Sequence, residues 1–126
     1  MPNTQTTLDT FTRAYIACAL WSSTDNADDS GGEPLDANYN ESDIAPATLA
    51  EIISDCAAFQ TDNADDLRTS RLSDEQAGHD FWLTRNGCGA GFWDRGLGKV
   101  GKTLTDAAHV WGSVNLYVGD DDQIYA

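Results

Sequence analysis

The chain has 126 residues, and its 21 acidic residues against 7 basic ones give a formal net charge of −14 at pH 7. This length predicts a single domain over residues 1–126, large enough to bury a core without metal or disulfide staples. The charge disfavours direct binding to nucleic acid or to an anionic membrane, because the long-range field of the protein repels phosphates.

The acidic residues are unevenly distributed, because no Lys or Arg stands between Arg13 and Arg68. We therefore predict a negative lobe built from a long acidic loop, about residues 23–45, and from the outer face of the helix that follows it. The carboxylates that we predict to bind a partner are Asp25, Asp28, Asp29, Glu33, Asp36, Glu41, Asp43, Glu51, Asp55 and Asp62.

The cellular setting is predicted from what the sequence lacks. No stretch reaches the roughly 18 unbroken apolar residues of a membrane span, and the N-terminus has no basic start and apolar core of a signal peptide. Cys18, Cys56 and Cys88 form no CxxC pair, so we expect no disulfide framework. These patterns predict a cytoplasmic protein with reduced cysteines and no membrane partner.

The first half of the chain has helical periodicity. Apolar residues recur at intervals of three and four from Leu8 to about Ser22, which predicts a helix with Thr6 or Thr7 as its N-cap and Trp21 on its buried side. In the acidic loop, Leu35 and Tyr39 are expected to anchor the chain to the core. A second helix is predicted from about residue 47 to 61, with a helical turn around residues 64–68.

The second half begins with an aromatic motif, HDFWLTRNGCGAGFWDR, at residues 79–95. Its Asn86-Gly87 dipeptide is a strong turn signal, so we predict a β-hairpin with Phe81 and Phe92 in the core. A helix over about residues 100–111 and a second hairpin around the GDDD turn complete the chain. The predicted fold class is α+β, in the order helix, helix, hairpin, helix, hairpin, with an antiparallel sheet packed against helices.

Two uses of the aromatic motif remain open. The use that we expect is structural, with aromatic cross-strand pairs that stabilise the hairpin. The alternative is a ligand-binding or enzymatic pocket, for which the candidates are His79, Asp80, Trp82, Arg85 and Trp93. No nucleophile with an adjacent base is recognisable, so we expect no catalytic residues and no enzyme activity.

The sequence predicts no cofactor and no metal site. His79, Cys88 and His109 are ligand types that zinc accepts, but their separations match no compact zinc spacing. The GDDDQ segment lacks the residue pattern of a calcium loop, so a solvated turn is expected there.

The segment AGHDFWLTRNGCGAGFWDRGLG, an Ala-rich helix and the ending LYVGDDDQIYA together resemble a family of small acidic proteins of unknown function from bacteriophages and some bacterial genomes. The resemblance covers about residues 15–126 and is densest over residues 77–98. A His is common in that family where Cys88 stands here, which counts against a metal or proton-transfer role at this position. The resemblance implies a phage context and no established activity.

Three functions are compatible with these patterns. The leading hypothesis is a non-enzymatic inhibitor or modulator of a basic nucleic-acid-binding host protein, such as a nuclease, a restriction enzyme or a CRISPR effector, in the host cytoplasm. Its carboxylates would imitate a nucleic-acid backbone, although such acidity is also compatible with a simple need for solubility. The alternatives are a small ligand-binding or enzymatic domain at the aromatic motif and a structural or assembly protein of the virion.

Overall fold

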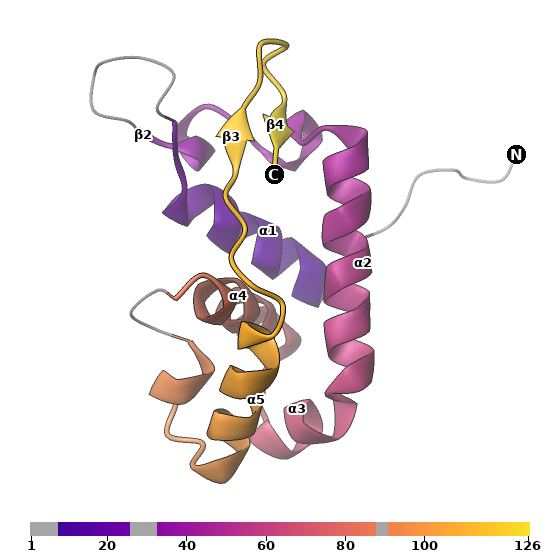
Figure 1. Cartoon of the computed structure of the whole chain (residues 1–126), viewed down its shortest axis with the longest axis vertical. Helices are drawn as coiled ribbons and strands as arrows, with labels where there is room; N and C mark the ends of the chain where they lie inside the picture. Colours follow the sequence, from indigo (N-terminus) through magenta and orange to yellow (C-terminus); the bar gives the residue numbers. More distant parts are fainter. Residues whose placement is uncertain (1–7, 26–32, 88–90) are drawn as a thin grey trace, which may run out of the picture.

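The computed structural model describes residues 8–25, 33–87 and 91–126. Helices dominate these residues, and short strand pairs occur at one end (Figure 1). The α-helices are α1 (Thr10–Ser22), α2 (Pro46–Asp62), α3 (Ala64–Ser70), α4 (Asp74–Arg85) and α5 (Lys99–His109). The strands are β1 (Thr24–Asp25), β2 (Glu33–Pro34), β3 (Tyr117–Val118) and β4 (Ile124–Tyr125), and the 3-10 turns are η1 (Leu35–Ala37), η2 (Glu41–Asp43) and η3 (Phe92–Asp94).

Helix α1 confirms the first predicted helix, with a different N-cap. The Asp9 side chain accepts a hydrogen bond from the Thr12 amide at 2.8 Å, whereas Thr6 and Thr7 lie outside the described residues. The prediction that Trp21 is buried was wrong, because its side chain is 59% exposed. The helical spacing of Phe11, Tyr15 and Cys18 continues to Ser22, whose hydroxyl accepts a hydrogen bond from Trp82 Nε1, so Trp21 lies beside this stripe.

The segment between α1 and α2 is less irregular than a loop. β1 and β2 form an antiparallel pair, and the turns η1 and η2 follow. Leu35 is fully buried and Tyr39 packs partly against the core, which confirms that these residues anchor the segment.

Helices α2 and α3 agree with the sequence pattern. Pro46 stands in the first turn of α2, where its missing N–H breaks no helical hydrogen bond. Ile52, Cys56 and Phe59 are the apolar side chains of α2 that enter the core. The predicted helical turn is α3, which ends at Arg71 in the left-handed conformation.

The predicted hairpin over residues 79–95 was wrong, because residues 74–85 form α4 and residues 92–94 form η3. Ser73 caps α4, because its side chain accepts a hydrogen bond from the Gln76 amide. Two acidic residues in the first turn interact favourably with the positive end of the helix dipole. The Asn-Gly dipeptide ends this helix instead of turning a hairpin, since Gly87 has a φ of 67°. Both a hairpin turn and the end of a helix favour a residue with positive φ, so the Asn-Gly signal was correct about the backbone and wrong about the element.

The end of the chain agrees better with prediction. Helix α5 is followed by β3 and β4, which pair in antiparallel register with Tyr117 opposite Tyr125. An isolated parallel bridge joins Ile44 to Ile124, so the terminal hairpin rests on the start of α2. The fold is α+β in the sense of helices with small antiparallel pairs, and a broad sheet packed against helices is not present among the described residues.

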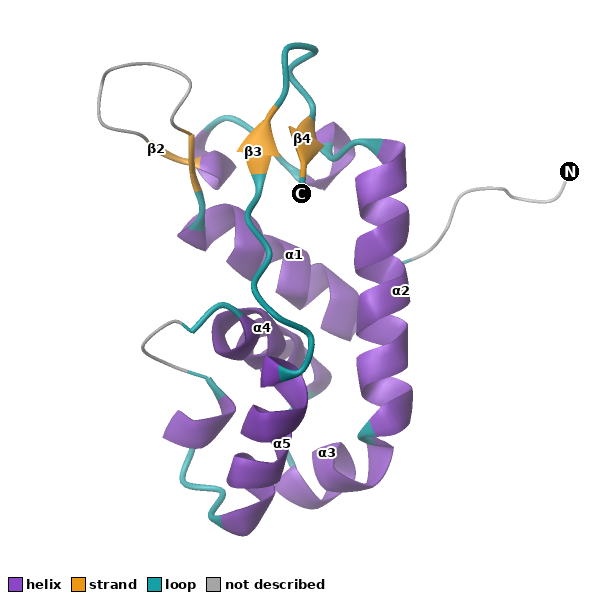
Figure 2. Cartoon of the chain, viewed as in Figure 1, coloured by secondary structure: helices purple, strands orange, loops and turns teal. Residues whose placement is uncertain are grey.

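Helices make up most of the fold (Figure 2), and the centre of the core is an aromatic cluster contributed by α1, α2, α4 and η3. The rings of Phe59 and Phe81 stack with centroids 4.1 Å apart, and the Phe92 ring lies 5.8 Å from that of Phe59. Helices α1 and α4 approach closely at Gly78, where an added Cβ would lie 2.0 Å from the carbonyl oxygen of Phe11. The aromatic motif therefore supplies the centre of the fold.

None of the helices in the described part of the chain has the length and apolar character needed to cross a membrane.

Candidate functional site

An ion pair closes the aromatic motif. The Arg95 guanidinium donates through Nη2 to Asp80 Oδ1 at 2.8 Å and through Nε to Asp80 Oδ2 at 3.1 Å. The Asp80 side chain is fully buried and also accepts a hydrogen bond from Gln76 Nε2 at 2.9 Å. These hydrogen bonds to Asp80 raise the pKa of Arg95. The Asp80 carboxylate is thus committed to joining α4 to the chain after η3.

The glycine before η3 permits a second link between the same elements. Thr84 Oγ1 accepts a hydrogen bond from the Phe92 amide at 3.1 Å. Gly91 has a φ of 143°, and an added Cβ at this position would lie 2.2 Å from Thr84 Oγ1. A larger residue would therefore push η3 away from α4 and withdraw Phe92 from the core.

Arg85 is the last residue of α4 and connects this end of the helix to its neighbours. Its side chain is buried, and the guanidinium lies over the rings of Phe81 and Trp111. It donates hydrogen bonds to four acceptors, namely Tyr15 Oη, Asp55 Oδ2, Trp111 O and Gly112 O. Burial raises the pKa of Tyr15, so its hydroxyl stays protonated beside this cation. Arg85 therefore ties α1, α2 and the end of α5 together.

The remaining candidates for the alternative pocket point to other neighbours. Trp82 is buried and donates through Nε1 to Ser22 Oγ at 2.6 Å. Trp93 is 53% exposed, and His79 is half-buried between α1 and α4, with no hydrogen-bond partner for its buried Nδ1. Since Asp80 faces Arg95 and Arg85 faces α2 and α5, the structure does not gather the five residues around one cavity.

Metal-ligating and nucleophilic side chains are dispersed in the described part of the chain. No group of three or more His, Cys, Asp or Glu among those residues is placed to hold a metal ion. Cys88 lies outside the described residues, so the structure gives no geometry for the trio with His79 and His109, whose spacing did not favour a zinc site. Cys18 and Cys56 are buried in the core, and burial raises the pKa of the Cys56 thiol to about 12.

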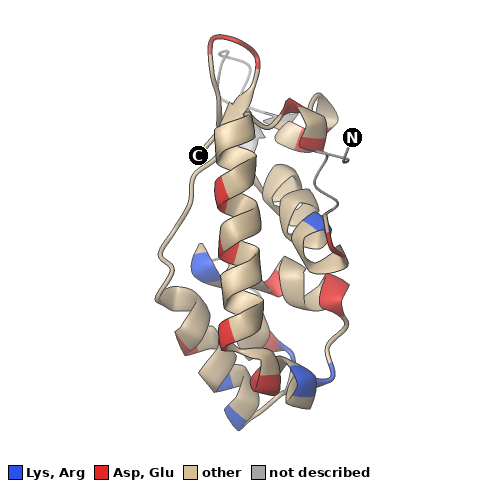
Figure 3. Cartoon of the chain, turned by 90° about the vertical axis from the view of Figure 1, so that its right-hand side faces the viewer, with Lys and Arg blue, Asp and Glu red and all other residues tan. Residues whose placement is uncertain are grey.

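Carboxylates gather on η2, on the outer face of α2 and at the tip of the β3–β4 hairpin (Figure 3). We call this surface the acidic ridge, and its members are Glu41, Asp43, Glu51, Asp62, Asp120, Asp121 and Asp122. Glu51 and Asp62 are exposed on α2, whereas Glu41 and Asp43 are half-buried in η2. Basic residues lie mainly on the other end of the molecule, on α3 and α5 and beside them (Figure 3).

The predicted partner-binding residues thus fall into four groups. Asp36 is exposed in η1, beside the ridge members already named. Asp55 is committed to the Arg85 network and does not stand free on the α2 surface. Asp25 and Glu33 belong to β1 and β2, while Asp28 and Asp29 lie outside the described residues.

The hairpin tip was not among the predicted partner-binding residues. Its exposed carboxylates follow from the GDDD turn, which the sequence analysis interpreted as a solvated turn. The Tyr125 hydroxyl donates to Asp121 Oδ2 at 2.6 Å, and this bond lowers the pKa of Asp121. The turn thus holds one carboxylate in place and leaves Asp120 and Asp122 exposed.

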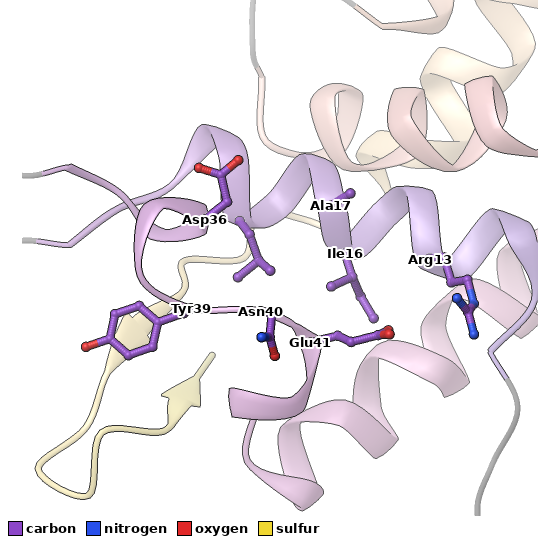
Figure 4. A pocket seen from close by; sticks show the side chains of 8 residues that line it. Arg13, Ile16, Ala17, Asp36, Tyr39, Asn40 and Glu41 are labelled. Atoms are coloured by element: carbon purple, nitrogen blue, oxygen red, sulfur yellow. The ribbon is translucent and has the colours of Figure 1, made fainter.

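A groove, also missed from the sequence, crosses the exposed face of α1. It consists of three adjoining hollows of about 360, 400 and 320 Å³, each lined in part by Arg13. We call it the α1 groove. Figure 4 shows the first hollow, where Ile16 of α1 points toward Asn40 and Glu41. The signal in the sequence was Arg13 itself, the one basic residue before Arg68.

Comparison with protein-family models, with curated proteins and with solved structures found no match to this chain.

Proposed function

We propose that this protein is a non-enzymatic binding protein whose acidic ridge occupies the basic nucleic-acid-binding groove of another protein. The observation that carries the proposal is the placement of the ridge carboxylates on the hairpin tip, on η2 and at intervals along α2 (Figure 3). Carboxylates arranged on a rigid helix and a short hairpin present negative charge at intervals, as a nucleic-acid backbone does.

The engagement of the aromatic motif supports a role outside catalysis. Asp80, Thr84 and Arg85 have their polar atoms in contacts that hold α4 to its neighbours. A general acid or base must reach a proton on a substrate, and the buried Asp80 is held between Arg95 and Gln76 instead. The surface carboxylates are therefore the groups that we propose to contact the partner.

The distribution of charge also favours this use. The hairpin tip and η2 carry carboxylates and no Lys or Arg, whereas acidic and basic residues are mixed around α3 and α5. The uneven field orients the molecule toward a basic partner, which speeds productive encounters. The resemblance to phage-encoded acidic proteins makes a host nuclease, a restriction enzyme or a CRISPR effector the class of partner that we propose.

Affinity capture tests the proposal. The protein is immobilised and exposed to a bacterial lysate at low and at high salt, and any captured protein is then challenged with duplex DNA and with RNA. We expect a basic nucleic-acid-binding protein that is released by salt and displaced by nucleic acid. Capture that resists both treatments would show that the contact is not nucleic-acid mimicry.

A further inference from the structure

We propose that the α1 groove binds a basic amphipathic helix of the partner, with apolar side chains in the hollows and Lys or Arg against the carboxylates around them. The inference rests on the proposed function, because it assigns to the same basic partner a second and more specific contact. The groove shares Glu41 with the ridge and differs from it in its other residues, so variants at those other residues test the two surfaces separately.

The floor of the groove is apolar. Ile16 and Leu20 of α1 form the floor of the first hollow, and Leu49 and Ile53 of α2 line the second. Ala17 and Ala50 are exposed, so their small side chains leave the space open. Hollows of a few hundred Å³ with apolar linings are the size that bound apolar groups occupy in proteins.

The length of the groove suits a helix. Arg13 and Leu20 both line the first hollow and are seven residues apart on α1, a distance of about 10 Å along a helix. An incoming helix of two turns spans the same distance and presents apolar side chains at spacings of three and four residues. The second hollow, on the α2 side of Arg13, extends the contact beyond α1.

The charges around the groove select a cationic helix. Asp36 and Glu41 line the hollow on the η1–η2 side, and Glu75 of α4 lines the third hollow. Arg13 is the single cation among the lining residues of these three hollows, against three carboxylates. It is exposed, and its Nε donates to Leu8 O at 3.3 Å. The net negative lining is complementary to Lys and Arg flanking an apolar stripe.

The probe is a synthetic peptide of Leu and Lys, about 18 residues long so that it holds a helix, with Leu at the spacings of one helical face. A scrambled peptide of the same composition has the same charge and no apolar stripe. Titration calorimetry of the full chain with each peptide is expected to give tighter binding of the amphipathic one. Equal binding of both peptides, or no binding of either, would overturn the proposal.

Filling the groove gives the second test. Ala17→Trp and Ala50→Trp place an indole in the hollows, whereas Ala57→Trp changes an exposed alanine of α2 that lines none of these hollows. The first two variants are expected to bind the amphipathic peptide about tenfold or more weakly, because the indole clashes with it. The third variant is expected to bind the peptide as the parent does. Circular dichroism melts confirm that all three remain folded. If both filled variants bound the peptide as the parent does, the groove would not be its binding site. The proposal about the acidic ridge would not be affected by that result.

A substitution at Arg13 tests whether the groove prefers a cationic or an anionic ligand. Arg13→Gln removes the cation of the groove, so the basic peptide is expected to bind roughly twofold to fivefold more tightly. Arg68→Gln removes the same charge from an exposed position on α3 and serves as the control. Weaker binding by Arg13→Gln would show that the groove prefers an anionic ligand and would overturn the proposed occupant.

Discussion

Asp80 holds Arg95 across fifteen residues of sequence, with 2.8 Å between the Arg95 Nη2 and Asp80 Oδ1 atoms, and Asp80 is fully buried. The pair joins α4 to the chain after η3 and so closes the aromatic motif around Phe92. Its partner Arg95 is 29% exposed, so water reaches the guanidinium from one side.

Arg95→Met should therefore destabilise the protein by about 3 to 5 kcal/mol, because it leaves an uncompensated carboxylate in the core. Lys102→Met breaks the exposed pair with Asp106 and should cost less than about 1 kcal/mol. Urea denaturation of the two variants measures both values. Equal losses of stability would show that burial of Asp80 contributes nothing to the fold.

Truncation of two neighbours in η3 should cost very different amounts of stability. Phe92→Ala removes a fully buried ring and should cost about 3 to 5 kcal/mol. Trp93 is 53% exposed, so Trp93→Ala should change the free energy of unfolding by less than about 1.5 kcal/mol. Thermal melts followed by circular dichroism compare them. A larger effect at Trp93 would place that side chain, and not Phe92, at the centre of the motif.

Gly78 should tolerate no side chain. In Gly78→Ala the new Cβ meets the backbone of Phe11, which cannot rotate away, so α1 and α4 must separate. Gly96→Ala is the comparison, because Gly96 has open space around it and carries only the strain of a positive φ, about 1 to 2 kcal/mol. Denaturation midpoints should fall much further for Gly78→Ala. A similar fall in both would mean that the two helices are not in such close contact.

Cys56 should resist thiol reagents in the folded protein. Burial raises its pKa to about 12, so the reactive thiolate is scarce at neutral pH. The group stabilises the fold fully below about pH 9, and this contribution is lost as the pH rises toward 12. Iodoacetamide labelling, resolved by peptide mass spectrometry with and without urea, measures the protection. Rapid labelling of native Cys56 would show that the site opens readily.

The helices with clear apolar periodicity were predictable from the sequence. Phe11, Tyr15 and Cys18 mark α1, while Pro46 and the Ile52–Cys56–Phe59 stripe mark α2. In α4, by contrast, buried residues occur on every side because the helix is central. Its sequence therefore lacks the alternation of apolar and polar faces that identifies a helix. The better signal was local, since Ser73 precedes two acids and Gln76, a pattern typical of a helix N-terminus.

The parts of the candidate site that depend on local sequence were predictable, and the parts that depend on tertiary contacts were not. The exposed carboxylates of α2 follow from helical periodicity, because Glu51 and Asp62 lie off the apolar stripe. Asp55 also lies off the stripe, but its capture by Arg85 depends on a contact across thirty residues that no local pattern encodes. The α1 groove likewise depends on how η1, η2 and α4 flank one helix, which only the assembled fold determines.

The central claim is that the charge of the acidic ridge drives binding to a basic partner. The ridge variant Glu51→Gln, Asp120→Asn and Asp122→Asn removes three exposed carboxylates with little change in shape. The matched control Asp65→Asn, Asp94→Asn and Asp106→Asn removes three exposed carboxylates elsewhere, so the two variants have the same net charge.

The most direct measurement is the association rate constant of each variant with the captured partner at low salt, by stopped-flow fluorescence. The ridge variant should associate about tenfold more slowly than the parent, since the local field that steers the encounter is reduced, and the control by less than about twofold. Rate constants that fall equally in both variants, or in neither, would contradict the ridge as the binding surface.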